Sequence, residues 1–200
     1  AQHEQENLLR RLAHYDTLTG LPNRVMLARK LADAMDQAHS VGALLGVAYL
    51  DLDGFKPVND RLGHDAGDRL LVVAAQRMVR SLRPQDCVAR LGGDEFAILL
   101  PKVQSVQECR QLLQQAMQSI ASPYQLGKHR VGVTASIGYT LYPQDDADAD
   151  TLLRHADQAM YAAKQAGRNR LHEFDTSQER QSRKVREQIQ RLREALVRGE

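Results

Sequence analysis

Two pairs of carboxylates are the residues of this sequence whose types and spacing could do chemistry. Asp51 and Asp53 stand two residues apart at the end of an apolar run, and Asp94 and Glu95 stand side by side after two glycines. Two adjacent anions repel each other, so such a pair indicates a cation or a metal–polyphosphate complex beside it. A solvated acidic turn would give the same pattern, so the second pair alone leaves both interpretations open.

The ions that suit these side chains are hard cations. Clustered carboxylates without His or Cys ligands favour Mg²⁺ over Zn²⁺. Two such ions under a polyphosphate imply phosphoryl or nucleotidyl transfer, in which one ion activates the attacking hydroxyl and the other stabilises the leaving pyrophosphate. Lys164 and Arg168, far along the chain, could neutralise charge on the phosphates, or could simply complement the C-terminus of their helix.

The carboxylates follow segments that have the pattern of strands. Residues 44–52 are apolar and β-compatible, which predicts a buried central strand. Because side chains alternate along a strand, Asp51 and Asp53 leave one face while Leu52 points into the core. Residues 88–100 contain two apolar runs separated by two glycines, which predicts a β-hairpin because glycine reaches positive φ at no steric cost.

The remaining elements supply a fold that brings these segments together. Apolar stripes at helical spacing predict helices over residues 23–40, 65–82, 105–121 and 151–166. Residues 131–141 alternate like a long strand, and residues 171–174 form a short edge strand. This order predicts an α+β fold, an antiparallel βαββαβ sheet with helices on one face, in which the end of the first strand neighbours the hairpin tip.

A polar, glycine-bearing stretch follows the first carboxylate pair. Residues 54–57 predict a turn whose backbone N–H groups, beside Lys56, could receive a phosphate. A plain turn would look the same. Asn59 and Asp68 could line a pocket close to the carboxylates, or could serve only as helix caps.

The composition is that of one ordinary domain with appendages. The chain has 200 residues, 42% hydrophobic and 26% charged, and a net charge of +2, which gives no argument for non-specific binding to nucleic acid or membranes. Trp is absent, which speaks against a base-stacking platform. Cys87 and Cys109 form no CxxC pair and suit a reducing cytoplasm as buried thiols. No signal peptide and no apolar run of about 18 residues is visible.

The two ends of the chain differ from its middle. We expect an N-terminal signalling helix over residues 1–15, a central domain over 16–175 and a linker helix over 176–200 toward a following domain. The first segment places leucines among charged residues, and the last lacks Gly and Pro until Gly199. Without an initiator Met, the sequence indicates a piece of a longer protein. The last segment carries a heptad-like stripe on a basic helix: Val185, Ile189, Leu192 and Leu196.

Motifs spread along the chain suggest a family. The hairpin reads Gly-Gly-Asp-Glu-Phe at residues 92–96. The others are Asp16-x-Leu18-Thr19-Gly20-Leu21-Pro22-Asn23-Arg24, Asp51-Leu52-Asp53-Gly54-Phe55-Lys56-x-x-Asn59-Asp60, Gly63-His64-x-x-Gly67-Asp68 and Ala163-Lys164-x-x-Gly167-Arg168-Asn169. With these motifs in order, the chain closely resembles the GGDEF diguanylate cyclase family over about residues 16–175, and the separated matches make the resemblance specific.

The resemblance implies a reaction and a set of metal ligands. Two GTP condense to cyclic di-GMP and two pyrophosphates, with one GTP held by each protomer of a homodimer. Asp51, the Leu52 carbonyl and Asp94 would bind Mg²⁺, with Mn²⁺ as the alternative ion and Glu95 close to the metals. Asp94 is also the position that activates the 3′-hydroxyl. Some relatives have Glu at this position, and the shorter side chain keeps the carboxylate, so we expect activity to survive.

The resemblance also implies which residues bind the nucleotide. Asn59 and Asp68 would recognise guanine, whose N–H donors suit a carboxylate. Lys164 and Arg168 would act on the triphosphate in catalysis. The expected GTP-binding residues are Gly54, Phe55, Lys56, Asn59, His64 and Asp68.

A further motif, Arg83-x-x-Asp86, has the spacing of the family's inhibitory product site. Arginine suits both phosphate pairing and stacking on guanine. Outside this family, the pair would be a helix-ending arginine beside a turn aspartate. The second arginine that relatives place on the following helix is unclear here, since Arg110 and Gln114 lie in that region.

Two functions from different classes remain open. The first is a working cyclase with product feedback. The second is a GTP-binding regulatory module that controls an adjoining EAL phosphodiesterase domain, because the helix after residue 175 resembles the linker that joins many GGDEF and EAL domains. A template-dependent polymerase palm is disfavoured, since no basic nucleic-acid cleft is evident. We expect a cytoplasmic domain, covalently linked to sensor and EAL domains, with no nucleic acid and no direct membrane contact, within a protein that could itself be membrane-anchored.

Overall fold

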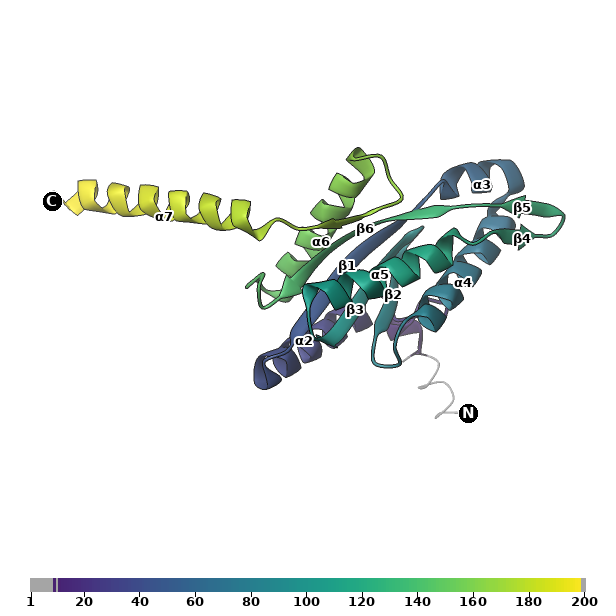
Figure 1. Ribbon diagram of the computed structural model, residues 1–200, viewed down its shortest axis with the longest axis horizontal. Coiled ribbons are helices and arrows are strands. Elements are labelled where there is room, and N and C mark those ends of the chain that lie inside the picture. Colours follow the sequence, from purple (N-terminus) through teal and green to yellow (C-terminus); the bar gives the residue numbers. More distant parts are fainter. Residues whose placement is uncertain (1–8, 10, 199–200) are drawn as a thin grey trace.

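A five-stranded sheet organises the molecule (Figure 1). The computed structural model describes residue 9 and residues 11–198. The strands lie in the order β2-β3-β1-β6-β7, and neighbours are antiparallel except for the parallel pair β6–β7. Their bounds are β1 Leu44–Asp53, β2 Cys87–Gly92, β3 Glu95–Val103, β6 Thr134–Tyr142 and β7 Leu171–Glu173.

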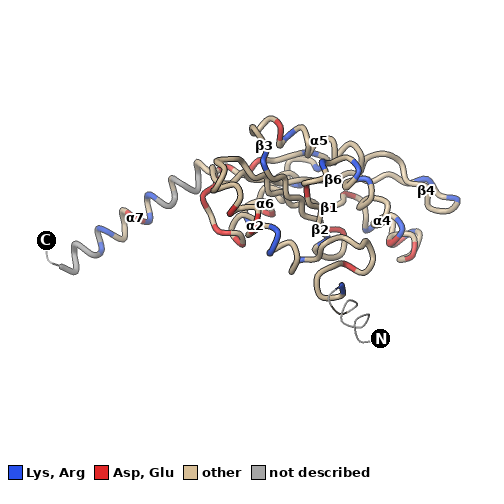
Figure 2. Tube along the Cα trace, turned by 90° about the horizontal axis from the view of Figure 1, so that it is seen from below, with Lys and Arg blue, Asp and Glu red and all other residues tan. Residues whose placement is uncertain are grey.

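Helices cover both faces of this sheet. One face packs against α3 (Phe55–Leu62), α4 (His64–Ser81) and α5 (Val106–Ala121), and the other against α2 (Arg24–Val41) and α6 (Ala149–Gln165). Figure 2 shows α5 on one side of the strands and α2 with α6 on the other. The α+β class and the mostly antiparallel sheet are confirmed, but the expectation of helices on one face only was wrong.

The reason lies in the central strand, whose two faces are both apolar. Alternate β1 residues Ala48 and Leu50 join the hydrophobic cluster under α4 and α5, while Val47 and Tyr49 join the cluster under α2 and α6. Burying both faces in this way requires a layer of helices on each side.

Close contact between α6 and the sheet depends on Gly138 of β6. A Cβ at this position would lie 1.9 Å from the Met160 backbone nitrogen and 2.2 Å from the Ala156 carbonyl oxygen. The helix backbone therefore rests directly on the strand, and this fixes the height of α6 above the end of β1.

Caps at the helix starts agree with the sequence. The Asn23 side chain accepts a hydrogen bond from the Met26 backbone nitrogen at the start of α2. Asp148 does the same for Thr151 at the start of α6. The predicted boundaries of these helices are therefore correct to within about two residues.

Two segments differ from the sequence-based expectation. Residues 54–57 start helix α3 instead of forming a turn, since a proline in the first helical turn removes no intrahelical hydrogen bond. The predicted long strand over 131–141 is divided: β6 begins at Thr134, and a small hairpin precedes it. That hairpin consists of β4 (Tyr124–Leu126) and β5 (His129–Val131).

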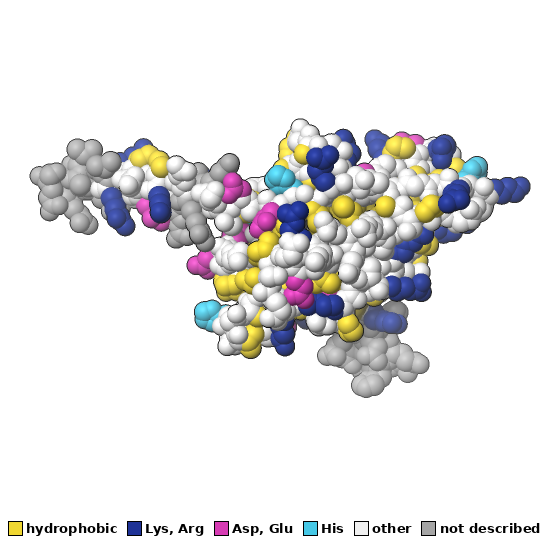
Figure 3. Space-filling view, in the orientation of Figure 1, with side chains coloured by type: hydrophobic (Ala, Val, Ile, Leu, Met, Phe, Trp, Pro, Cys, Tyr) yellow, Lys and Arg dark blue, Asp and Glu magenta, His cyan; other side chains and the backbone are white. Residues whose placement is uncertain are grey.

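The C-terminal helix α7 (Thr176–Arg198) extends away from the body (Figure 1). Val185 and Ile189 of the predicted stripe are 48% and 45% exposed, and Figure 3 shows hydrophobic side chains beside Lys and Arg on this helix. The side chains of Leu192 and Leu196 lie outside the described residues, as does most of the predicted N-terminal helix. In the described part of the chain, no helix is long and apolar enough to cross a membrane.

Candidate active site

The end of β1 and the tip of the β2–β3 hairpin meet at one edge of the sheet. Asp51 pairs with Glu95 in the β1–β3 register, and the Leu52 backbone nitrogen donates to the Asp94 carbonyl oxygen at 3.2 Å. The convergence of these carboxylates therefore follows directly from the antiparallel pairing of the two strands. It joins residues that are more than forty positions apart in the sequence.

The hairpin tip is held by a side chain that sequence analysis did not identify. Gly92 and Gly93 both have positive φ, 145° and 49°. Arg90 donates from Nε and Nη2 to the Gly93 carbonyl oxygen, at 3.0 and 2.8 Å, and from Nη1 to Asp16 Oδ1 at 3.0 Å. Burial by itself would raise the pKa of Asp16, but hydrogen bonds from Thr19 and Arg90 outweigh it and lower that pKa.

Asp51 and Asp94 form an electrostatically strained pair. Asp51 is buried at 8% exposure. Burial, together with the hydrogen bond and negative charge of Asp51, raises the pKa of Asp94 to about 6, although Lys164 partly opposes the shift. Two facing carboxylates with oxygen donors suit a divalent cation, which would relieve their repulsion. The residues present therefore fit a hard metal ion.

Glu95 takes a different direction in this structure. Its Oε2 accepts a hydrogen bond from the Tyr49 hydroxyl at 3.1 Å. Burial, and then the charges of Glu95 and Asp157, raise the pKa of Tyr49, so the phenol remains a donor. Within the described residues, no group of three or more Asp, Glu, His or Cys side chains is arranged to hold a metal. Side-chain ligation would therefore rest on Asp51 and Asp94.

Asp53 makes its contacts on the side of β1 that pairs with β6, away from the hairpin. Its carboxylate accepts hydrogen bonds from Thr134 Oγ1 at 2.9 Å, Ser136 Oγ at 2.8 Å and the Asn169 backbone nitrogen at 3.1 Å. Its spacing from Asp51 suggested that Asp53 would share the carboxylate site, but two strand hydroxyls of β6 and a backbone N–H bind it instead.

Two cations stand at the C-terminal end of α6. Lys164 Nζ forms an ion pair with the Asp51 carboxylate. Arg168 lies in the turn after the helix, with φ of 62°. The structure therefore connects Lys164 to the carboxylate site directly, while Arg168 lies in a turn that is bound to Asp53 through the Asn169 backbone.

Helices α3 and α4 form a second wall beside the end of β1. Gly54, with φ of 79°, begins α3, so the backbone N–H groups of the first turn, including those of Phe55 and Lys56, have no intrahelical partner. Helix N-termini of this kind favour anions. The phenyl ring of Phe55 is buried in the core, so only its backbone could contact a ligand.

The predicted guanine residues lie where α3 meets α4. The Asn59 Oδ1 atom is buried, and among the described residues it has no hydrogen-bond partner. A Cβ at Gly67 would lie 1.7 Å from this oxygen, so the glycine makes room for the amide. Asp68 and His64 are exposed on α4. The exposed Asp68 carboxylate offers acceptors to a ligand that carries N–H donors, whereas the Asn59 oxygen is buried against Gly67.

A family model described as "Diguanylate cyclase, GGDEF domain" matches residues 13–170. The chain belongs to the GGDEF family. It is 41% identical over 187 residues to the bifunctional diguanylate cyclase/cyclic di-GMP phosphodiesterase MucR of Pseudomonas aeruginosa. That alignment covers 94% of this chain but only 27% of MucR, so the chain spans about a quarter of this curated relative.

Solved GGDEF structures share the fold. The GGDEF domain of TpbB from P. aeruginosa superposes with a TM-score of 0.78 at 40% identity, covering 85% of this chain and 99% of that one. The coiled coil and GGDEF domain of DgcB from Caulobacter crescentus, in complex with c-di-GMP, gives 0.77 at 29% identity, covering 86% and 91%. These likenesses place this chain with diguanylate cyclase GGDEF domains of cyclic di-GMP signalling.

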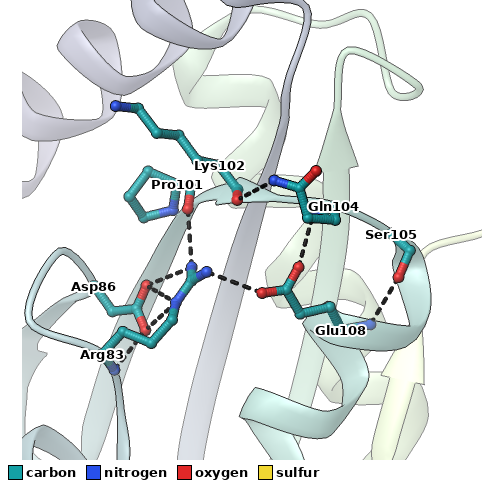
Figure 4. A network of polar contacts seen from close by, with 7 residues as sticks. All are labelled: Arg83, Asp86, Pro101, Lys102, Gln104, Ser105 and Glu108. Carbon is teal, nitrogen blue, oxygen red and sulfur yellow. Dashed lines mark hydrogen bonds and ion pairs between the residues drawn. The ribbon is translucent and has the colours of Figure 1, made fainter.

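The Arg83-x-x-Asp86 motif of this GGDEF domain forms a closed polar network (Figure 4). Arg83 donates from Nε and Nη2 to the Asp86 carboxylate, whose side chain is 0% exposed, and from Nη2 to the Pro101 carbonyl oxygen. Nη1 pairs with Glu108 Oε1 at 3.1 Å. Hydrogen bonding to Asp86, followed by its charge and that of Glu108, raises the pKa of Arg83 against the effect of burial.

This network lies far from the carboxylate site of the GGDEF domain. Pro101 is six residues along β3 from Glu95, which corresponds to about 20 Å of strand. Glu108 was missed by sequence analysis, which considered Arg110 and Gln114 on the same helix. The available signal was the Ser105-x-x-Glu108 capping box, which fixes Glu108 at the start of α5.

Proposed function

We propose that this GGDEF domain condenses two GTP into cyclic di-GMP and two pyrophosphates. The observation that carries the proposal is the facing pair Asp51 and Asp94, with the pKa of Asp94 raised to about 6 by burial and by its partner. Paired carboxylates at the mouth of a phosphate-binding helix suit nucleotidyl transfer. The names of the relatives support the same activity.

In this proposal, the Asp51 and Asp94 carboxylates and the Leu52 carbonyl hold Mg²⁺, or Mn²⁺ in its place, with Glu95 beside them. The bound ion supplies Lewis acidity at the phosphate oxygens. Asp94 also accepts the proton of the attacking ribose 3′-hydroxyl. One site holds one GTP, so a homodimer is needed to bring two nucleotides together.

In this proposal, the nucleotide is held by α3 and α4 on one side of the Asp51–Asp94 pair and by the end of α6 on the other. The backbone N–H groups of Gly54, Phe55 and Lys56 bind the phosphates at the start of α3, and Lys164 and Arg168 neutralise the charge that develops there. Guanine is recognised by Asn59 and Asp68, with His64 at the rim. The exposed carboxylate of Asp68 supports this placement.

Regulation is proposed at two further places. Arg83 and Asp86 bind cyclic di-GMP as an inhibitor; the complex of DgcB with c-di-GMP supports binding of this nucleotide by a related protein. Residues 176–200 link the cytoplasmic domain of residues 16–175 to an EAL domain, and residues 1–15 bring in the signal of a sensor domain. The bifunctional name of MucR supports this organisation.

The test is product formation by the purified chain with GTP and Mg²⁺, followed by mass spectrometry. We expect cyclic di-GMP from the unmodified protein and none from Asp94→Ala, while Asp36→Ala, an exposed acid on α2, serves as the matched control and remains active. Calorimetry with GTP and circular dichroism establish that the Asp94 variant is folded.

A second candidate function is a GTP-binding regulatory module for an adjoining EAL domain. Exposed Val185 and Ile189 on the projecting helix α7 favour a role in coupling domains. The two candidates differ in one result: a chain that binds GTP yet forms no product, even when fused to a dimerising coiled coil, is the regulatory module.

A further inference from the structure

The turn after α6 has an unusual backbone. Three successive residues have positive φ: Gly167 at 114°, Arg168 at 62° and Asn169 at 47°. For residues that carry a Cβ, this region is unfavourable, so two of the three are held there against their intrinsic preference. Local hydrogen bonds hold part of this turn, from the Arg168 backbone nitrogen to the Ala163 carbonyl oxygen at 3.1 Å and from Arg170 Nε to the Arg168 carbonyl oxygen at 3.0 Å. Contacts from other elements hold the rest.

Asp53 supplies one of these contacts from across the sheet. Its Oδ2 accepts a hydrogen bond from the Asn169 backbone nitrogen at 3.1 Å, over a sequence separation of 116 residues. Next along the chain, the Arg170 carbonyl oxygen accepts from the Ile137 backbone nitrogen at 3.0 Å. The turn is thus attached to β1 and to β6 on the C-terminal side of Arg168.

Asp53 is itself rigidly held. Ser136, which is fully buried, donates to Oδ1, and Thr134 donates to Oδ2. These three donors use most of the acceptor capacity of the carboxylate. Asp53 therefore links β6 to the turn, and we call this set of hydrogen bonds the bracket. Its oxygens accept hydrogen bonds from protein donors, so they have little capacity left for a metal ion.

The position of Arg168 follows from two anchors on one strand. Lys164 pairs with Asp51, and Asn169 is bound by Asp53, two residues further along β1. Arg168 lies between these anchored residues. We infer that Asp53 is a positioning residue that sets the turn so that Arg168 reaches the triphosphate. This inference rests on the proposed function, because it concerns how the same site holds GTP.

Substitutions at Asp53 separate positioning from charge. In Asp53→Asn, Oδ1 can still accept from Asn169 while Nδ2 donates to the Ser136 hydroxyl, which also accepts hydrogen bonds. This variant keeps the hydrogen bonds to Asn169 and Ser136 and loses the negative charge. In Asp53→Ala the bracket is lost as well. We therefore expect Asn to preserve nucleotide affinity and Ala to weaken it.

The experiment measures the affinity of the full chain, by calorimetry with Mg²⁺, for a non-hydrolysable GTP analogue and for GMP. We expect Asp53→Ala to weaken the analogue by about tenfold or more, as for loss of a charge-assisted hydrogen bond, and to leave GMP within about twofold. Asp148→Ala, which removes the cap at the other end of α6, is the matched control and should leave both affinities unchanged. If Asp53→Ala does not fold, Asp53→Ser, too short to reach Asn169, takes its place.

A double-mutant cycle with Arg168→Ala decides whether Asp53 acts through Arg168. We expect Asp53→Ala to have little further effect once Arg168 is absent. Additive losses, an Arg168→Ala variant with unchanged affinity, or an Asn variant as weak as the Ala variant would each overturn the positioning role. Failure of the unmodified chain to bind the GTP analogue would instead overturn the proposed function, and the inference with it.

Discussion

Glu108→Gln tests the proposal that Arg83 and Asp86 bind cyclic di-GMP. Glu108 Oε1 lies 3.1 Å from Arg83 Nη1, while Nε and Nη2 are already engaged by Asp86 and the Pro101 carbonyl oxygen. An anionic ligand must therefore displace the carboxylate or bind beside it. The change to Gln removes the competing charge at the site, so we expect it to increase affinity for cyclic di-GMP.

The size of the effect follows from the exposure of the pair. The Arg83 and Glu108 side chains are 22% and 31% exposed, and ion pairs near the surface contribute up to about 1 kcal/mol, which corresponds to about a fivefold gain in affinity. Glutamine keeps one acceptor oxygen for the helix start, and its NH2 group, which only donates, then faces Arg83. The Gln104 backbone nitrogen donates to Glu108 Oε2 at 2.6 Å, and the capping box accepts Gln as well as Glu. The melting temperature should therefore fall by at most about 2–4 °C, which is the contribution of the ion pair alone.

Calorimetric titration with cyclic di-GMP, alongside thermal unfolding, checks this expectation. Glu108→Ala is the comparison variant, because it removes both the charge and the acceptor for the Gln104 backbone nitrogen and should lower the melting temperature by about a further 2–4 °C. Arg83→Ala should lose binding. If Glu108→Gln leaves affinity unchanged or lowers it while the fold is intact, Glu108 does not compete with the product.

Three further predictions concern the fold and the hairpin. Asp16→Asn should lower the free energy of unfolding by about 1–2 kcal/mol at pH 7. Because the pKa of Asp16 is lowered in the folded state, this difference is present above about pH 4 and disappears as the pH falls through the folded pKa. Denaturant titrations at several pH values measure it. Gly138→Ala should cost about 3 kcal/mol or more, because the new methyl overlaps the Met160 backbone, and urea unfolding would show it. Burial raises the pKa of Cys109 to about 12, so we expect iodoacetamide to modify this thiol only when the protein unfolds, as mass spectrometry would detect; rapid modification of the native protein would contradict the burial.

Local patterns predicted the elements whose signals lie within one stretch of sequence. The apolar run before Asp51 predicted β1, and the two glycines before Asp94 predicted the hairpin. The apolar run of β1 also indicates helices on both faces of the sheet, because a strand that is apolar on both faces must be buried on both. The prediction of helices on one face did not take this into account. For residues 54–57 a turn was predicted, but the structure has the start of α3. Gly and Pro are compatible with a turn and with a first helical turn equally.

Contacts between distant segments could not be predicted from spacing. Glu108 reaches Arg83 over 25 residues, and Asp53 reaches Asn169 over 116. Neither pair follows a periodicity, since each depends on how whole elements pack. The direction of Glu95 toward Tyr49 is of the same kind, because it is set by cross-strand packing rather than by the signature in which Glu95 occurs.

Four consecutive residues at the end of β1 hold the parts of this site in place. Asp51 pairs with Lys164 of α6, and the Leu52 backbone nitrogen binds the hairpin at Asp94. Asp53 fixes the turn after α6, and Gly54 starts α3. Side chains alternate with a period of two, so inserting one residue here would turn Asp53 toward the core and detach the turn from the strand. The spacing of residues 51–54 therefore sets the geometry of a site whose other members come from the hairpin, from α6 and from α3.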